Sequence, residues 1–409
     1  MSTYQYVSTN ILTGQLLGQS IPLSVRSATC EISGAGRLDG YLPLNTQTAA
    51  ATAGFMRALI PGQAMLWVLQ DGYPVWHGVV LDSPHQSIKS HQYPITAYTP
   101  EAIFQGRVIQ GALTYTSMDV FDIARALVVY GTTNSPMIPN AQIAGLVGLG
   151  RGSTSSGVTD TLTFGVSNTL TAGGDTYSGT YSDEQQVLDA LTTLAAADGF
   201  EFTFSPQLNG TTLQSTLRLG YPALGQYDSP SPLVLMFPGN VIDYARPIMR
   251  SQAANFIIGT SAANGSGATY TSQWPNGVDS NDLDQGNLLQ QIAVTWPGVG
   301  VTGQSQINQY VNTLIAKYTA GTMVPSIVLG GGQQPSLKQI GLGDAVAFAA
   351  TSDLDPAGPN GEPGLQVTAR ITGWNLQPPD EQNEQPEQLT LTLGALVGST
   401  GIGGVGIPQ

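Results

Sequence analysis

Charged side chains are scarce in this sequence of 409 residues, and only 10% of its positions are Asp, Glu, Lys or Arg. The 13 basic residues are outnumbered by 27 acidic ones, which gives a formal net charge of −14. Because nucleic-acid-binding proteins need a basic face, this balance disfavours sustained binding to phosphate. An ordinary soluble domain has about 25% charged residues, so we expect an unusually uncharged surface.

Cysteine is limited to a single residue, and long apolar runs are missing. Cys30 is alone, which excludes a disulfide or a thiolate zinc cage within one chain, and we expect it to be a small buried apolar residue. No run approaches the ~18 apolar residues of a membrane span. The N-terminal segment has neither a basic stretch nor an apolar run, so we expect no secretory signal and synthesis in a cytoplasm.

Histidine is limited to His77, His85 and His91, none of which adjoins a candidate nucleophile in the sequence. Neither Gly-x-Ser-x-Gly nor His-Glu-x-x-His occurs, so common hydrolase machinery has no support. We expect surface or strand histidines, no catalytic, cofactor-binding or metal-binding residue, no cofactor and no enzyme activity. A pair of carboxylates suited to glycosidase chemistry stays open, because sequence alone does not fix their separation.

Three segments resemble ligand loops but lack a required residue. Residues 148–153 are glycine-rich without the Lys of a phosphate loop. Residues 279–284 lack the fifth-position and twelfth-position residues of an EF-hand, and residues 353–362 have oxygen donors but two prolines. We expect a loop and two solvated turns. Among the tryptophans, which could also stack on sugars, Trp67 and Trp76 lie in strand-like sequence, where core or interface packing is expected.

What the sequence does contain favours β structure. The 50 glycines and 26 prolines favour turns and short strands, and the 41% hydrophobic fraction indicates a folded chain of two to four domains. Residues 23–32, 38–44 and 92–98 read as strands. The strongest local signal is Asp71-Gly72 between the apolar runs 64–70 and 73–80, which predicts a type I′ hairpin.

Helical spacing appears in the middle of the chain. It predicts a helix over residues 119–130, with Ser117 as N-cap and Gly131 as the stop, and a long loop over residues 145–174. A second helix should begin at a capping box in residues 182–185 and end at Asp198-Gly199. An alternating pair of strands around Asn209-Gly210 should follow, which together gives an α+β unit.

Strand patterns then return, and the chain divides into four parts. We predict strands at residues 233–237, 241–246, 255–259, 324–329, 345–350, 365–374 and 388–393, with one amphipathic helix at residues 305–320. The predicted fold is mainly β with an α+β insert. Its parts are a first antiparallel β-barrel at 1–105, the insert at 106–234, a second β-barrel at 235–397 that includes the helix, and a Gly-rich tail at 398–409.

Several short sequence motifs resemble those of a known family. Gly-Ala-Gly-Arg-Leu-Asp-Gly-Tyr-Leu-Pro-Leu at residues 34–44, with the hairpin at residues 66–78, resembles the N-terminal region of minor tail proteins of actinobacterial siphophages. That family is similar to the baseplate hub of contractile tails. Ile-Gly-Leu-Gly-Asp-Ala-Val at residues 340–346, with the strand at residues 367–374, is similar to the closing barrel of such hubs.

The resemblance implies a structural protein of the virion. It implies a tail-tip hub in which three copies form a ring of two tube-like barrels each, with the distal tail protein, the tape measure protein and other tail-tip proteins as partners and genomic DNA passing through unbound. The resemblance further implies a location at the tail tip after synthesis in the host bacterial cytoplasm. No lysozyme-like or peptidase module is expected. A distal tail or receptor- and sugar-binding tail protein is the alternative, and a cell-wall hydrolase is a distant third.

Overall fold

The computed structural model describes most of the two β-rich segments and part of the region between them. The described residues are 2–44, 48–84, 91–133, 176–182, 184–220, 223–226, 232–245, 256–261, 269–274, 291–295, 304–319, 326–331, 334–379 and 386–394. The histidine at position 85 and the segments 148–153 and 279–284 singled out above lie outside these ranges, as do the whole of the expected loop at 145–174 and the whole tail at 398–409.

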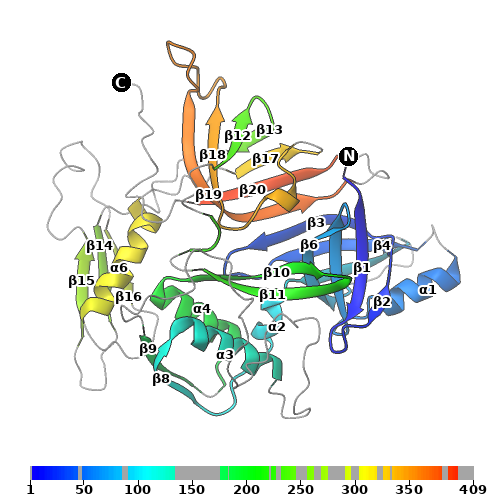
Figure 1. The fold of residues 1–409 in the computed structure, drawn as a ribbon, viewed down its shortest axis with the longest axis horizontal. Helices are drawn as coiled ribbons and strands as arrows, with labels where there is room; N and C mark the ends of the chain where they lie inside the picture. The colour runs from blue at the N-terminus through cyan, green and yellow to red at the C-terminus, as the bar shows by residue number, and fades with distance from the viewer. Residues whose placement is uncertain are drawn as a thin grey trace.

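The largest element is a 13-stranded sheet that runs through both β-rich segments (Figure 1). Its strands from the first segment are β1 (Tyr4–Asn10), β2 (Leu16–Gly18), β3 (Ser24–Glu31), β4 (Arg37–Pro43), β5 (Ala64–Gln70), β6 (Tyr73–Asp82) and β7 (Gln92–Tyr98). Those from the second are β12 (Leu233–Phe237), β13 (Val241–Ala245), β17 (Ser326–Gly330), β18 (Ala345–Ala350), β19 (Leu365–Gln377) and β20 (Gln388–Gly394).

The path of this sheet shows how the two segments meet. The order is β13-β17-β20-β19-β3-β4-β7-β6-β5-β1-β2, with β12 on β18 and β18 on β19. The antiparallel pair β3–β19 joins the segments, and its register places Cys30 opposite Trp374. The predicted mainly β class with antiparallel sheets is confirmed, with parallel pairing at β12–β18 and β14–β16. The division at residues 105 and 234 and closure of each half into a barrel stay predictions.

The middle of the chain packs helices on hairpins beneath the first segment (Figure 1). Its elements are α2 (Glu101–Gln105), β8 (Leu113–Asp119), α3 (Val120–Thr133), β9 (Thr176–Tyr181), α4 (Val187–Asp198), β10 (Glu201–Asn209) and β11 (Thr212–Gly220). A further group joins β14 (Phe256–Thr260), β15 (Thr271–Trp274) and β16 (Gln291–Thr295) to α6 (Gln304–Thr319). Helix α1 (Ala49–Ala58) and the 3-10 turn η4 (Leu337–Gln339) complete the described elements.

Strand β5 explains why one segment of the sequence is apolar on both faces. Leu66 and Val68 enter the core shared by the two β-rich segments, whereas Met65 and Trp67 enter the core of the α+β insert. A strand covered on both faces reads as a continuous hydrophobic run instead of an alternating one. The insert is therefore anchored on the outer face of the first β segment.

The local turn predictions are confirmed. Asp71 and Gly72 both have positive φ, 51° and 81°, as a type I′ turn requires, and β5 pairs with β6 across them. Gly199, with φ 73°, ends α4 in the left-handed conformation. These two predictions are confirmed. The predicted turn at Asn209-Gly210 is also confirmed, because β10 pairs with β11 along their whole lengths.

The predicted N-caps of two helices are wrong, although helices expected at residues 119–130 and 305–320 are found as α3 and α6. Ser117 lies inside β8, and the N-cap role belongs to Asp119, whose carboxylate accepts bonds from the N–H groups of Phe121 (2.8 Å) and Asp122 (3.3 Å). Gly131 does not stop α3, which continues to residue 133, and a Cβ at this glycine would lie 2.8 Å from the ring of Phe104.

The predicted capping box at residues 182–185 does not start α4 either. Helix α4 begins after Gln186, which makes no side-chain capping bond. Backbone groups in the preceding segment bond instead to Ile109, which donates to Gln185 and accepts from Glu184 at 2.8 Å each. Tertiary pairing thus takes the place of local capping. Among the helices that the structure describes, none is long and apolar enough to cross a membrane.

Candidate functional site

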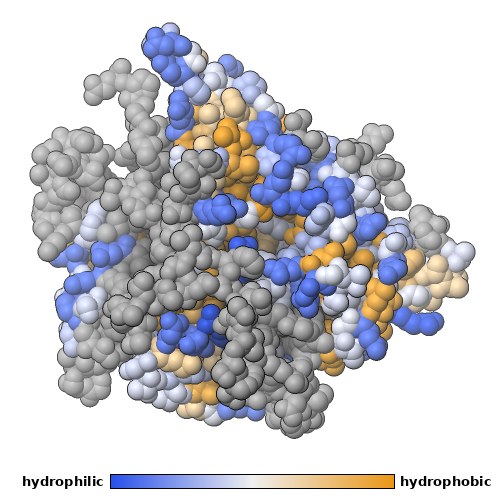
Figure 2. All heavy atoms as spheres, viewed as in Figure 1, coloured by the Kyte–Doolittle hydropathy of each residue, from blue (hydrophilic) through white to orange (hydrophobic). Residues whose placement is uncertain are grey.

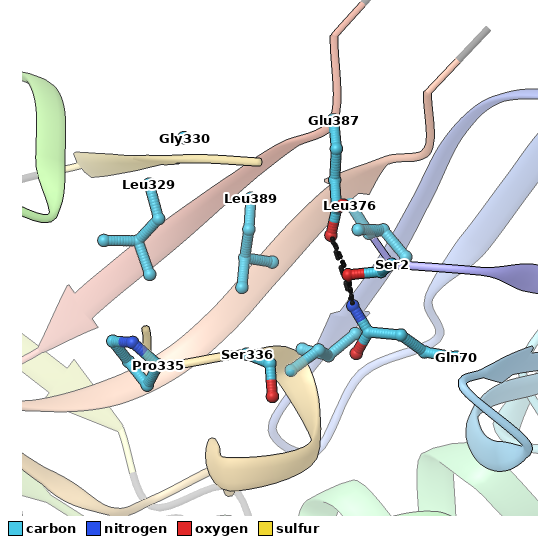
Figure 3. Close-up of a pocket in the computed structure, with 10 residues that line it drawn as sticks. Ser2, Gln70, Leu329, Gly330, Pro335, Ser336, Leu376, Glu387 and Leu389 are labelled. Atoms are coloured by element: carbon cyan, nitrogen blue, oxygen red, sulfur yellow. Dashed lines mark hydrogen bonds between the residues drawn. The ribbon is translucent and has the colours of Figure 1, made fainter. Parts of the chain in front are cut away.

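The first notable site is a buried polar joint between the start and the end of the described chain (Figure 3). Glu387 Oε1, just before β20, accepts hydrogen bonds from Tyr4 Oη (2.7 Å), Ser2 Oγ (3.3 Å) and Gln70 Nε2 (3.2 Å). Gln70 Nε2 also donates to Tyr4 Oη at 2.9 Å. Burial, reinforced by the Glu387 carboxylate, raises the pKa of Tyr4 above its usual range. Residues 385 positions apart are thus held by one carboxylate.

A cavity of about 20 Å³ adjoins this joint, room for about one water. Glu387 and Gln70 line it, and Figure 3 shows Leu329, Leu389 and Pro335 on its other side. Within the described part of the chain, Glu387 Oε2 and Gln70 Oε1 are buried without a hydrogen-bond partner. The joint therefore has acceptors left over that a water would satisfy.

A second joint, an ion pair, connects the insert to β19. Arg370 on β19 forms an ion pair with Glu201 on β10, and the same Glu201 oxygen accepts the N–H of Leu224 at 3.0 Å. The Arg370 side chain is 4% exposed and that of Glu201 is 25% exposed. This ion pair is nearly buried, and it fixes how the insert meets β19.

The Leu-Gly-Asp turn that carries part of the family resemblance lies next to this joint. Gly343 has φ +89°, and a Cβ there would lie 2.0 Å from the carbonyl oxygen of Leu224. Asp344 accepts the N–H groups of Gly341 and Gln226, both at 2.9 Å. The turn therefore requires glycine for its backbone and aspartate for its hydrogen bonds, at the place where the chain leaves the insert.

A buried carboxyl group holds the insert against the first β segment. Glu101 in α2 is 0% exposed, and its Oε1 accepts the N–H of Phe204 at 3.1 Å and lies 3.5 Å from the hydroxyl of Thr203. Its Oε2 is buried and has no hydrogen-bond partner among the described residues. Burial raises the pKa of Glu101 to about 7, against a few opposing hydrogen bonds.

His77 lies beside a hydroxyl that the sequence did not reveal. Its Nε2 is 2.6 Å from Ser215 Oγ on β11, and its ring stacks on Trp67, with centroids 4.9 Å apart. Both His77 and Ser215 are almost fully buried, and burial lowers the pKa of His77 to about 3. A neutral imidazole and a serine without solvent access form a packing contact. His91 is exposed in the turn before β7.

The other residues singled out in the sequence have different outcomes. Trp67 and Trp76 are 0% and 1% exposed, which confirms the expected core packing. Cys30 is half-buried in β3 and packs against the core, so it is less buried than expected. In residues 353–362, Asp355 is buried and accepts from Tyr244 Oη at 2.8 Å instead of lying in a solvated turn. No group of three or more His, Cys, Asp or Glu suited to a metal occurs within the described ranges.

An open hollow of about 580 Å³ lies where β3, β19 and the insert meet, and Glu31, Glu201 and Asn375 contribute to its lining. Its one tryptophan among the described residues, Trp374, is only 7% exposed. A sugar-binding groove stacks its ligand on an exposed aromatic face, which this hollow lacks in the described part of the chain. Geometry here gives no support to the sugar-binding alternative.

The two ends of the large sheet expose apolar side chains. We define the β2 end by Leu12, Leu16, Leu17 and Ile60, and the β13 end by Val234, Met236, Ile242 and Leu354; all eight are at least 37% exposed. Figure 1 shows β2 with α1 on one side of the molecule and β12 with β13 on another. Figure 2 shows hydrophobic surface around the α1 and β2 region. Exposed apolar side chains grouped in this way are candidates for interaction surfaces.

The chain has a mainly β fold that tail proteins share. Its features are the large, mostly antiparallel sheet, the α+β insert on one face of that sheet and the pairing of β19 with β3. The chain is similar to the tail protein from Neisseria meningitidis MC58, with a TM-score of 0.56 and 14% identity over 95% of this chain and 96% of that one. It is also similar to the 43 kDa tail protein of prophage MuSo2 from Shewanella oneidensis, with a TM-score of 0.52 and 12% identity over 96% and 98%.

The chain is also similar to a chain of the Francisella PdpA-VgrG complex, with a TM-score of 0.50 and 7% identity. The match spans 98% of this chain and 59% of that chain. No protein-family model matches the sequence, and no curated protein is significantly similar to it. At these identities the comparisons establish the fold alone.

Proposed function

We propose that this protein is a structural component of a phage tail, and that it acts as the tail-tip hub. The observation that carries the proposal is that 95% or more of the chain follows the fold of two tail proteins, each over almost its whole length. A match of that extent includes the β-rich segments and the insert in one arrangement. The likeness therefore concerns the whole assembly unit and not one common motif.

The internal joints support a structural role. The Tyr4–Glu387 and Glu201–Arg370 contacts hold together parts of the chain that are far apart in sequence, and both are largely buried. The polar groups that are most deeply buried, among them His77 and Ser215, are enclosed by packing and not aimed into an accessible cleft. We propose a protein that transmits force between neighbours and catalyses no reaction.

The proposed hub is a ring of three copies around a channel. The ring number rests on the family resemblance, in which two tube-like barrels per chain give six positions that match a hexameric tail tube. Three copies carry a formal charge of about −42, since each chain carries −14. A neutral or acidic channel lets DNA slide without binding. The distal tail protein, the tape measure protein and other tail-tip proteins are the proposed neighbours, in the virion.

A reconstruction of tail particles that contain this chain tests the proposal. The expected result is threefold density for the chain at the tip of the tail, with few Arg or Lys side chains facing the channel. Sixfold density would instead place the chain in a distal ring, and single-copy density or a channel lined by basic residues would refute the hub. Incubating the protein with actinobacterial cell walls should give no clearance, whereas clearance abolished by one carboxylate substitution would refute the non-catalytic role.

A further inference from the structure

The buried joint around Glu387 brings two oxygen atoms to one small cavity without a partner for either. Glu387 Oε2 and Gln70 Oε1 are buried and accept no hydrogen bond from the described residues. The two side chains are 8% and 1% exposed, and both line the cavity of about 20 Å³. Leaving a buried acceptor without a partner is costly. Two such oxygens beside one cavity therefore indicate that it binds a small ligand.

The lining of the cavity offers oxygen atoms and no basic side chain. Its polar side chains are those of Ser2, Gln70, Ser336 and Glu387, each of which carries an oxygen, and the other residues that line it are leucines, a proline and a glycine. Figure 3 shows Ser2, Gln70 and Glu387 next to one another on one side of it. Carboxylate, amide and hydroxyl oxygens are the ligands that hard cations prefer.

The charge of Glu387 has no counter-charge in the described part of the chain. The ion pairs of that part do not include it, and the three donors to its Oε1 are all neutral. Lys338, which follows the lining residue Leu337, places its Nζ over the ring of Tyr73, 4.1 Å from the ring centre. A buried charge is costly unless a partner of opposite charge or a metal accompanies it. A water in the cavity would satisfy both oxygens and leave the charge unbalanced, whereas a cation does both.

We propose that the cavity binds one monovalent cation of the size of Na⁺ or K⁺, held by Glu387 Oε2 and Gln70 Oε1. The cavity has room for about one water, and these ions are no larger than a water molecule. One carboxylate balances one positive charge. A Ca²⁺ ion takes about 6–8 oxygen ligands and a Mg²⁺ ion keeps several waters, for which this cavity is too small. Pro386, beside Glu387, is exposed, so the site lies close to the surface and the cation exchanges with solvent.

The cation links the start of the chain to the last described strand. Gln70 ends β5 and donates to Ser2 and Tyr4, whereas Glu387 directly precedes β20. A ligand that binds the folded chain and not the unfolded chain stabilises the fold. The stability of the protein should therefore depend on which cation is present at constant ionic strength. The site lies within one chain, so it does not depend on the proposed ring.

Urea unfolding of the full-length protein measures this dependence. The three salts are KCl, NaCl and N-methyl-D-glucamine chloride, each at an ionic strength of about 0.15 M. The N-methyl-D-glucamine cation is too large for the cavity and supplies ionic strength alone. The equilibrium constant for folding should be about tenfold larger in KCl or NaCl than in the glucamine salt, and the gain should follow the binding curve of a single site as one salt replaces the other.

Two substitutions in the joint and one outside it assign the effect to the cavity. Glu387→Gln removes the charge and Gln70→Met removes Oε1 at a similar side-chain length, so each should abolish the difference between the salts. Glu201→Gln is the matched control, because this partly buried carboxylate already has Arg370 as its cationic partner. It should keep the full difference. Crystals of the wild type soaked in RbCl give a measurement that needs no variant, and an anomalous peak for Rb⁺ should lie in contact with Glu387 Oε2 and Gln70 Oε1.

Four outcomes would overturn the proposal. Equal folding constants of the wild type in the three salts would show that the cavity holds a water only. A difference that Glu387→Gln retains would show that the cations act elsewhere. Stabilisation by CaCl₂ that neither KCl nor NaCl reproduces would refute a monovalent ion, and so would a cavity without an Rb⁺ peak. The tail reconstruction does not enter this test, so the proposed function and the cation site fail separately.

Discussion

The substitution Glu101→Gln should reverse its effect on stability as pH rises. The glutamine keeps the oxygen that accepts the N–H of Phe204 and removes the titrating group from a site that is 0% exposed. Its amide nitrogen takes the place of Oε2, which has no hydrogen-bond partner among the described residues. The protonated carboxyl of the wild type has one O–H donor, whereas the amide has two N–H donors, so the variant carries one more buried donor. An unsatisfied buried donor costs about 1–3 kcal/mol, so at low pH the variant should be less stable than the wild type.

The pH-dependent part follows from the sign of the shift. Burial raises the pKa of Glu101 from 4.5 to about 7, so the folded protein holds this proton more tightly than the unfolded chain does. The stability that this group contributes is complete below about pH 4.5 and is lost as pH rises through 7. The gap corresponds to roughly 3 kcal/mol, at 1.36 kcal/mol for each tenfold change in proton affinity. The glutamine variant has no such loss.

Urea unfolding of both proteins at pH 5, 6, 7 and 8, followed by tryptophan fluorescence, measures the difference. The stability of Glu101→Gln relative to the wild type should rise by roughly 3 kcal/mol across this range and reach or exceed zero near pH 8. Asp189→Asn, which removes an exposed carboxylate of α4, is the control for the loss of a carboxyl group outside the core. A constant or falling difference for Glu101→Gln would show that the buried carboxyl does not titrate near neutrality.

Three further substitutions test the joints by the same unfolding measurement. Glu201→Gln leaves the nearly buried Arg370 without its anionic partner and should cost about 3 kcal/mol, the lower part of the range for buried pairs since Glu201 is partly exposed; unchanged stability would contradict the joint. Tyr4→Phe removes the hydroxyl that donates to a buried carboxylate and should cost about 1–2 kcal/mol, with no effect as the refuting result. Gly343→Ala should cost about 2 kcal/mol more in stability than Gly361→Ala, because of the steric clash and strain at Gly343. Gly361 has a similar φ of +85° but open space around it. Equal costs would refute the close backbone approach at Gly343.

Local signals in the sequence were sufficient for the hairpins and for the end of α4. Asp71-Gly72, Asn209-Gly210 and Gly199 act through their own backbone conformation, so neighbours in sequence decide the outcome. The start of α4 depended on Ile109, about 80 positions away, and no local pattern contains that information. Helix α1 was missed because residues 49–58 are half alanine and have no apolar stripe.

The joints were harder to predict than the elements. Glu387 lies in a segment rich in Glu, Gln and Pro that reads as a solvated turn, yet it is 8% exposed because three hydroxyl and amide groups from the start of the chain surround it. Ser215 and His77 are 138 positions apart and meet only when the insert packs on β6. Burial of such polar side chains depends on long-range packing. The composition and periodicity of a sequence do not reveal that packing.

The pairing of β3 with β19 also determines when this protein completes its fold during synthesis. Strand β3 emerges from the ribosome early, whereas its partner Trp374 follows Cys30 by roughly 340 residues. At about 5–20 residues per second, one side of β3 waits roughly 17–70 seconds for β19. Contacts of such long range fold slowly. The nascent chain thus carries an open strand edge on β3 until β19 has been synthesised, and its yield in a cell depends on what protects that edge meanwhile.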